Sequence, residues 1–89
     1  MNIYGFILRV KYQQYLDNGI EEAIERASED MLIKPVVFQD HGKIFIDARI
    51  EAENEGQALN NLLVRLHNVG IKARYHNTIP AVQIKSHLL

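Results

Sequence analysis

Apolar and polar residues alternate along residues 43–53, Lys-Ile-Phe-Ile-Asp-Ala-Arg-Ile-Glu-Ala-Glu. The even-numbered positions from Ile44 to Ala52 are all apolar, and the odd-numbered positions are charged apart from Phe45. A period of two is typical of a strand with one face in a core and the other in water. Because this strand is long, we expect it to lie centrally in a sheet, with a neighbour on each side.

The same alternation predicts three further strands, at residues 3–11, 36–39 and 71–76. The segment 12–16 fits either a continuation of the first strand or a turn into a helix. Asp40, His41 and Gly42 join the second strand to the long one. Three loop residues ending in glycine favour a hairpin with a type I turn and a glycine bulge.

A first amphipathic helix is predicted after Asn18, which has the side chain of an N-cap and is followed three residues later by Glu21. Apolar residues then recur at three- and four-residue spacing, as one face of a helix requires. They are Ile20, Ala23, Ile24, Ala27 and Met31. Pro35 prevents the helix from continuing into the second strand.

A second helix is predicted after Asn54, where Gln57 repeats the capping pattern. Its apolar stripe consists of Ala58, Leu59, Leu62, Leu63 and Leu66. Gly70 follows the stripe and suits the left-handed position just beyond a helix end. The predicted order of elements is therefore β-α-β-β-α-β.

Right-handed crossovers turn this order into an α+β sandwich, a four-stranded antiparallel sheet of order 4-1-3-2 with both helices on one face. Over residues 1–76 the arrangement resembles the ferredoxin-like fold, a resemblance of architecture that implies no activity. Residues 77–89 would form a C-terminal extension of the same domain, 1–89. Its segment Ala81–Lys85 alternates like a short extra strand that pairs with a sheet edge, in the same chain or in a neighbouring subunit.

Composition excludes several classes of protein. The 89 residues contain no cysteine, which rules out disulfides, thiolate metal sites and cysteine nucleophiles. The hydrophobic content of 47% and the charged content of 24% are those of a globular domain. The N-terminal residues lack the basic region of a signal peptide, and no apolar run is long enough to span a membrane. We therefore expect a cytoplasmic protein.

The predicted sheet has a helix-covered face and an open face. The helices should cover Phe6, Leu8, Val10, the even positions of the long strand, and Ile71, Ala73 and Tyr75. The open face then carries Ile7, Arg9, Lys11, Phe45, Asp47, Arg49, Glu51, Lys72, Arg74 and His76. The candidate binding residues on it are Ile7, Arg9, Lys11, Phe45, Asp47, Arg49, Lys72 and Arg74.

Two interpretations of this open face compete. Residues 42–46, Gly-Lys-Ile-Phe-Ile, are faintly similar to the third-strand motif of RNA-recognition domains, which stack bases on outward aromatic residues. The first strand, however, offers Ile7 where a second stacking ring would be expected. Cross-strand ion pairs between Arg9 or Lys11 and a carboxylate of the long strand would explain the mixed charges without a ligand. The net charge of −1 also lacks the basic excess usual in nucleic-acid binders.

No catalytic, metal or cofactor site is predicted. The four histidines have no ligand spacing. Asp40 beside His41 could form an acid–base pair, but adjacent turn residues usually diverge. The segment 11–19 lacks the arginine and the glycines of the phosphate loop of acylphosphatases, which share this architecture.

We therefore expect a non-catalytic interaction module that self-associates through the open sheet face or a sheet edge, with another protein as the other possible partner. The alternative is a domain that binds single-stranded RNA or DNA on the same face. Small-molecule sensing at a dimer seam is a third possibility, which rests on analogy with regulatory domains of similar topology.

Overall fold

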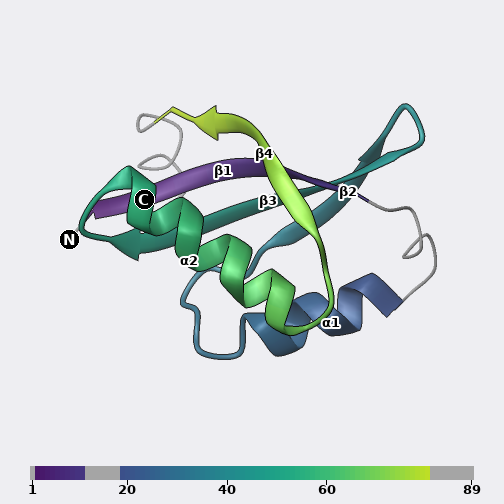
Figure 1. The fold of residues 1–89 in the computed structure, drawn as a ribbon, viewed down its shortest axis with the longest axis horizontal. Helices are drawn as coiled ribbons and strands as arrows, with labels where there is room; N and C mark the ends of the chain where they lie inside the picture. The colour runs from purple at the N-terminus through teal and green to yellow at the C-terminus, as the bar shows by residue number, and fades with distance from the viewer. Residues whose placement is uncertain (1, 12–18, 81–89) are drawn as a thin grey trace.

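A computed structural model describes residues 2–11 and 19–80 (Figure 1). Its elements, in chain order, are β1 (Asn2–Val10), α1 (Gly19–Ala27), β2 (Val36–Asp40), β3 (Lys43–Ala52), α2 (Glu55–Asn68) and β4 (Ala73–Ile79). The β-α-β-β-α-β order predicted from the sequence is confirmed. The predicted N-cap Asn18, the ambiguous segment 12–16 and the predicted extra strand at 81–85 lie outside the described residues.

The four strands form one antiparallel sheet in the order β2-β3-β1-β4, so the fold is α+β. Counted from the β4 edge, this is the 4-1-3-2 order predicted from the sequence. The long strand β3 lies inside the sheet, with β1 on one side and β2 on the other, as its length and alternation predicted.

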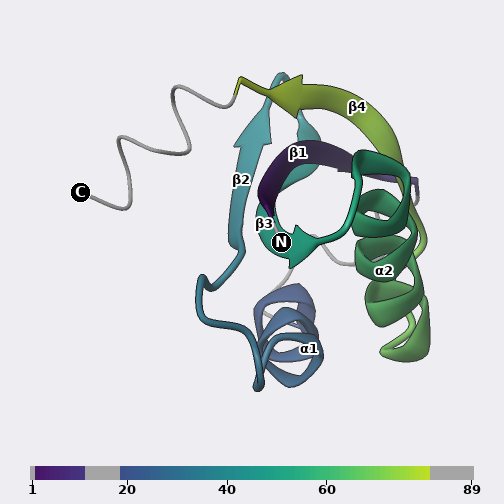
Figure 2. The same cartoon turned by 90° about the vertical axis from the view of Figure 1, so that its left-hand side faces the viewer.

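Both helices pack on the same face of the sheet, which curls around them (Figure 2). The buried cluster between the sheet and the helices contains Phe6, Leu8, Val10, Ile20, Ala23, Ile24, Ile44, Ile46, Ala48, Ala52, Ala58, Leu62, Leu66 and Ile71. Apart from Ile71, these residues occupy even-numbered positions of β1 and β3 or belong to the apolar stripes of the two helices. The predicted division into a covered face and an open face therefore holds for β1 and β3.

Helix α1 ends at Ala27, earlier than the stripe through Met31 predicted. The Ser28 hydroxyl donates to the Ile24 carbonyl at 2.8 Å, and the Lys34 ammonium donates to the Ser28 and Glu29 carbonyls. The Ile24 carbonyl also accepts from the Ser28 amide, so the helical bonding is intact to this point. Beyond the helix, the Lys34 side chain satisfies carbonyls that the amides of a longer helix would have satisfied. Met31 packs against the core from the following loop instead.

Both ends of α2 have the caps that the sequence predicted. The Asn54 side chain accepts a hydrogen bond from the Gln57 amide at 2.9 Å. At the other end, Gly70 has a φ of 84°, its amide donates to the His67 carbonyl, and the Ile71 amide donates to the Leu66 carbonyl. These two bonds define a Schellman motif, which places the fully buried Ile71 against the core.

The β2–β3 hairpin differs from the predicted turn. Asp40 pairs with Lys43, so the loop contains only His41 and Gly42. Their φ angles of 51° and 74° are both positive, which defines a type I′ turn rather than a type I turn with a bulge. Two-residue loops favour this turn because its twist matches that of the flanking strands.

Strand β4 contains a β-bulge, and the sequence-based prediction for this strand was wrong in two respects. Tyr75 pairs with Leu8 and Asn77 pairs with Ile7, so His76 is an extra residue. The strand therefore continues to Ile79 instead of ending at His76. The bulge reverses the alternation, which places the buried Ile79 opposite Gly5, on the open face. Tyr75 lies opposite the core residue Leu8 and its ring contacts that of Phe6, but it is 48% exposed rather than covered by a helix.

Candidate functional site

The open face contains all eight candidate residues in neighbouring positions. Ile7 and Arg9 belong to β1, and Lys11 follows it directly. Phe45, Asp47 and Arg49 belong to β3, and Arg74 belongs to β4, with Lys72 just before that strand. Arg9 lies directly between Phe45 and Arg74, and Ile7 is opposite Asp47. The antiparallel register therefore brings residues from the two halves of the chain onto one surface.

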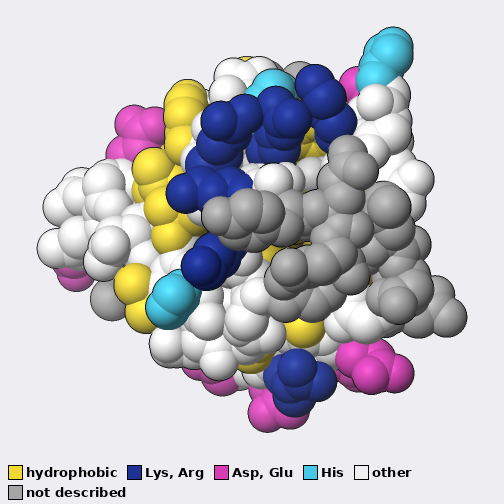
Figure 3. Space-filling view, turned by 45° about the vertical axis from the view of Figure 1, so that its right-hand side comes forward, with side chains coloured by type: hydrophobic (Ala, Val, Ile, Leu, Met, Phe, Trp, Pro, Cys, Tyr) yellow, Lys and Arg dark blue, Asp and Glu magenta, His cyan; other side chains and the backbone are white. Residues whose placement is uncertain are grey.

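Positive charge is concentrated at the hairpin end of this face. We call Arg9, Lys11, Lys43, Lys72 and Arg74 the basic cluster. The two arginines are direct cross-strand neighbours, and the Lys11 amide donates to the Lys72 carbonyl at 2.8 Å. Figure 3 shows Lys and Arg side chains gathered on one side of the molecule. Within residues 2–11 and 19–80, Arg9, Lys11, Lys43 and Arg74 make no ion pair.

The carboxylate of Asp47 on this face is paired within β3. Asp47 accepts from Arg49 at 3.2 Å from Nε and 3.4 Å from Nη2. The expected cross-strand pairs of Arg9 or Lys11 with a β3 carboxylate do not form in the described part of the chain. Residues two apart on a strand share a face, so this local pair competes directly with cross-strand partners.

Three aromatic rings form a row across the open face. Phe38 stacks on Phe45 with ring centroids 5.4 Å apart, and His76 lies on the other side of Phe45 at 4.9 Å. Phe45 is consequently only 7% exposed and is not itself available for stacking with a ligand. The accessible rings of this row are Phe38 and His76. Alternation had placed His76 on the open face without naming it as a candidate binding residue. Phe38 was not placed there, although its outward position in β2 could have revealed it.

The outer strand β2 exposes apolar side chains. Leu32, just before the strand, is 93% exposed, Val36 is 60% exposed and Phe38 is 39% exposed. Hydrogen-bonded pairs alternate along an antiparallel ladder and begin at the residues flanking a two-residue loop. Asp40, Phe38 and Val36 therefore bond to β3, and the amides and carbonyls of Val37 and Gln39 point outward. The described residues provide no strand partner on that side.

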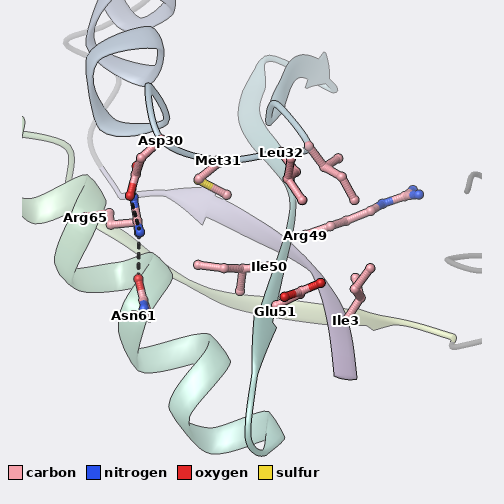
Figure 4. Close-up of a pocket in the computed structure, with 10 residues that line it drawn as sticks. Ile3, Asp30, Met31, Leu32, Arg49, Ile50, Glu51, Asn61 and Arg65 are labelled. Atoms are coloured by element: carbon pink, nitrogen blue, oxygen red, sulfur yellow. Dashed lines mark hydrogen bonds and ion pairs between the residues drawn. The ribbon is translucent and has the colours of Figure 1, made fainter. Parts of the chain in front are cut away.

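A groove of about 290 Å³ lies where β3 extends beyond the start of β2 (Figure 4). Met31, Leu32 and Ile33 line it from the loop before β2. Ile3 of β1 and Arg49, Ile50 and Glu51 of β3 line its sheet side, and Asp30, Asn61 and Arg65 complete it. In Figure 4 the polar residues Asp30, Arg65 and Asn61 are joined to one another rather than directed at an empty site.

The described residues show little catalytic or metal-binding chemistry. No group of three or more His, Asp or Glu side chains among them could hold a metal ion. Asp40 and His41 do approach each other at the hairpin tip, with Oδ1 and Nδ1 2.9 Å apart, so the expectation that they diverge was wrong. Both side chains are largely exposed, and no third side chain of residues 2–11 and 19–80 bonds to either of them. No helix in the described ranges is both long and apolar enough to cross a membrane.

Comparison with known proteins yields no family assignment. No protein-family model, curated protein or solved structure matches this chain. Function must therefore be argued from the surfaces described above.

Proposed function

We propose that this domain is a non-catalytic interaction module of the ferredoxin-like architecture that self-associates through the outer edge of β2. The element order and the strand order support the architecture. The single observation that carries the function is the apolar outer strand, in which exposed Val36 and Phe38 flank outward-pointing backbone groups.

Exposed edge strands are normally protected against pairing with other chains. Charged side chains, prolines, bulges and inward-pointing charges are the usual means. In β2 the four residues from Val36 to Gln39 include no charge, no bulge and no proline, and Pro35 lies just outside the strand. Leu32 adds a further exposed apolar side chain on the approach to the strand. This combination favours an edge that is covered in the functional state.

A second copy of the same chain is the simplest partner that pairs with the unbonded backbone groups of this edge. Two β2 strands related by a two-fold axis pair antiparallel, so the outward groups of Val37 and Gln39 in one copy meet those of the other. The two sheets then continue into one another. Val36 and Phe38 of both copies lie on the same face of the joined sheet and contact across the seam.

The decisive experiment introduces a charge on the strand without damaging the fold. Val36 is directly opposite Asp47, so Val36→Lys gains a possible cross-strand partner for its ammonium while making edge pairing costly. Val64→Lys, at an exposed apolar residue of α2, is the matched control. Light scattering after size-exclusion chromatography should show a dimer for the wild type and for Val64→Lys, and a folded monomer for Val36→Lys.

A second variant tests the backbone contribution. Gln39→Pro removes an outward amide that makes no bond to β3, so the isolated domain should tolerate it, as edge strands tolerate proline. The dimer should be lost. A wild type that is monomeric at all micromolar concentrations, or a dimer that survives both Val36→Lys and Gln39→Pro, would refute the proposal.

A further inference from the structure

The basic cluster is an electrostatic feature that the edge dimer does not explain. Its five cations come from three strands and the residues that adjoin them, and they share one end of the open face. Arg9 and Arg74 lie directly opposite each other in the sheet. Like charges in such positions destabilise a sheet. On the same face Arg49 is paired with the carboxylate of Asp47. In the described residues, Arg9 and Arg74 have no such carboxylate partner.

An anionic ligand would relieve this repulsion. The chain as a whole carries a net charge of −1, so the cluster is a local concentration and not the consequence of a basic protein. A cluster of several cations on adjacent strands matches a ligand with repeated negative charges better than a single small anion. The phosphate backbone of a nucleic acid is such a ligand.

The rings beside the cluster favour a single strand over a duplex. Phe45 of β3 is the cross-strand neighbour of Arg9. Its ring contacts Phe38 on one side and His76 on the other. Both outer rings keep accessible surface. Unpaired bases stack on exposed rings beside a cationic path, whereas bases within a duplex are not available for this contact.

We propose that the hairpin end of the open face binds single-stranded nucleic acid, with the basic cluster on the phosphates and the rings of Phe38 and His76 on the bases. The phosphate contacts supply most of the affinity and no sequence preference. The basic cluster and His76 lie on β1, β3, β4 and the residues that adjoin them, away from the outer edge of β2. Phe38 is the one residue of the site that also lies at the proposed dimer seam.

The test is a fluorescence-anisotropy titration of a labelled, mixed-sequence single-stranded oligonucleotide, in DNA and RNA forms, over a range of salt concentrations. Arg74→Gln removes one cation from the cluster, and Arg26→Gln removes one exposed cation from α1 as the charge-matched control. Arg74→Gln should weaken binding and reduce the slope of log affinity against log salt by about 0.7 for one lost phosphate contact. Arg26→Gln should leave both unchanged.

The ring contribution is tested with His76→Ala, which should weaken single-strand binding roughly five-fold or more. The monomeric Val36→Lys variant should still bind, which separates this inference from the proposed dimer. Three results would overturn the inference: no saturable binding at physiological salt, equal losses from Arg74→Gln and Arg26→Gln, or a duplex of the same sequence bound as tightly as the single strand.

Discussion

The guanidinium of Arg65 in α2 donates to both carboxylate oxygens of Asp30, at 2.6 and 3.0 Å. The same side chain donates to the Asn61 side chain one turn earlier in α2 and to the Ala27 carbonyl at the end of α1. One arginine therefore joins the second helix to the segment in which the first helix ends. Its hydrogen bond lowers the pKa of Asp30 below the ordinary carboxyl value and raises the pKa of Arg65.

This pairing predicts a pH-dependent contribution to stability. Because the pKa of Asp30 is lower in the folded protein than in the unfolded chain, its stabilisation is present above the ordinary carboxyl pKa and is lost as the pH falls through the folded value. Asp30→Asn should lower the free energy of unfolding at neutral pH, and the deficit should shrink on acidification. Urea melts at several pH values measure it.

The double variant Asp30→Asn/Arg65→Gln is the control for that prediction. Once Arg65 is replaced, Asp30→Asn should change how stability varies with pH much less, because the largest cause of the lowered Asp30 pKa has been removed. A deficit for Asp30→Asn that is the same at neutral and acidic pH would show that the carboxylate contributes nothing through its charge.

Shortening a single core side chain of β3 should cause a large loss of stability. Ile46 is fully buried and lines the same small apolar pocket as Leu62, as expected for two residues that face each other between sheet and helix. Ile46→Ala should cost about 2–5 kcal/mol in the free energy of unfolding. Val64→Ala, at an exposed position of α2 away from the proposed seam, should cost no more than about 0.5 kcal/mol. A loss below about 1 kcal/mol for Ile46→Ala in denaturant melts would contradict the packing described here.

Two glycines, one near the start of α2 and one just past its end, provide a matched pair of substitutions. Gly70 has a positive φ, so Gly70→Ala should destabilise the domain by about 1–2 kcal/mol. Gly56 is within α2, and an added Cβ would meet only the Asn54 side-chain oxygen at 3.4 Å. Gly56→Ala should therefore stabilise the domain, by up to about 1 kcal/mol. Thermal melts of the two variants should shift in opposite directions, and equal shifts would argue against the Schellman geometry.

The hairpin turn predicts a stabilising substitution. His41 has a φ of 51°, a conformation that asparagine adopts more readily, and Asn-Gly is the preferred pair in type I′ turns. His41→Asn should raise the free energy of unfolding by up to about 0.5 kcal/mol, because the lost contact with Asp40 is highly exposed and worth little. His41→Val should be destabilising. Should His41→Val melt at or above the wild type, the assigned turn type would be wrong.

Much of the candidate site was predictable because alternation in a strand is a local property. The period of two assigned Arg9, Lys11, Phe45 and Asp47 to the face opposite the helices before any tertiary contact was known. Alternation does not predict how exposed each residue on that face is. Phe45 was expected to be an accessible ring, yet Phe38 and His76 cover it, since ring contacts depend on three strands in register.

The sequence by itself determined the order of the elements, the covered face of β1 and β3, both caps of α2 and the position of the β2–β3 hairpin. Each of these follows from side-chain periodicity or from the backbone preferences of asparagine and glycine over a few residues. Only the tertiary structure decided where α1 ends, how β4 continues and which charges are paired. Arg65 donates to the carbonyl of Ala27, the last residue of α1, and Lys34 donates to the Glu29 carbonyl just beyond it. The bulge at His76 is defined by the pairing of β4 with β1. Such features depend on contacts between residues distant in the chain, which a local pattern does not encode.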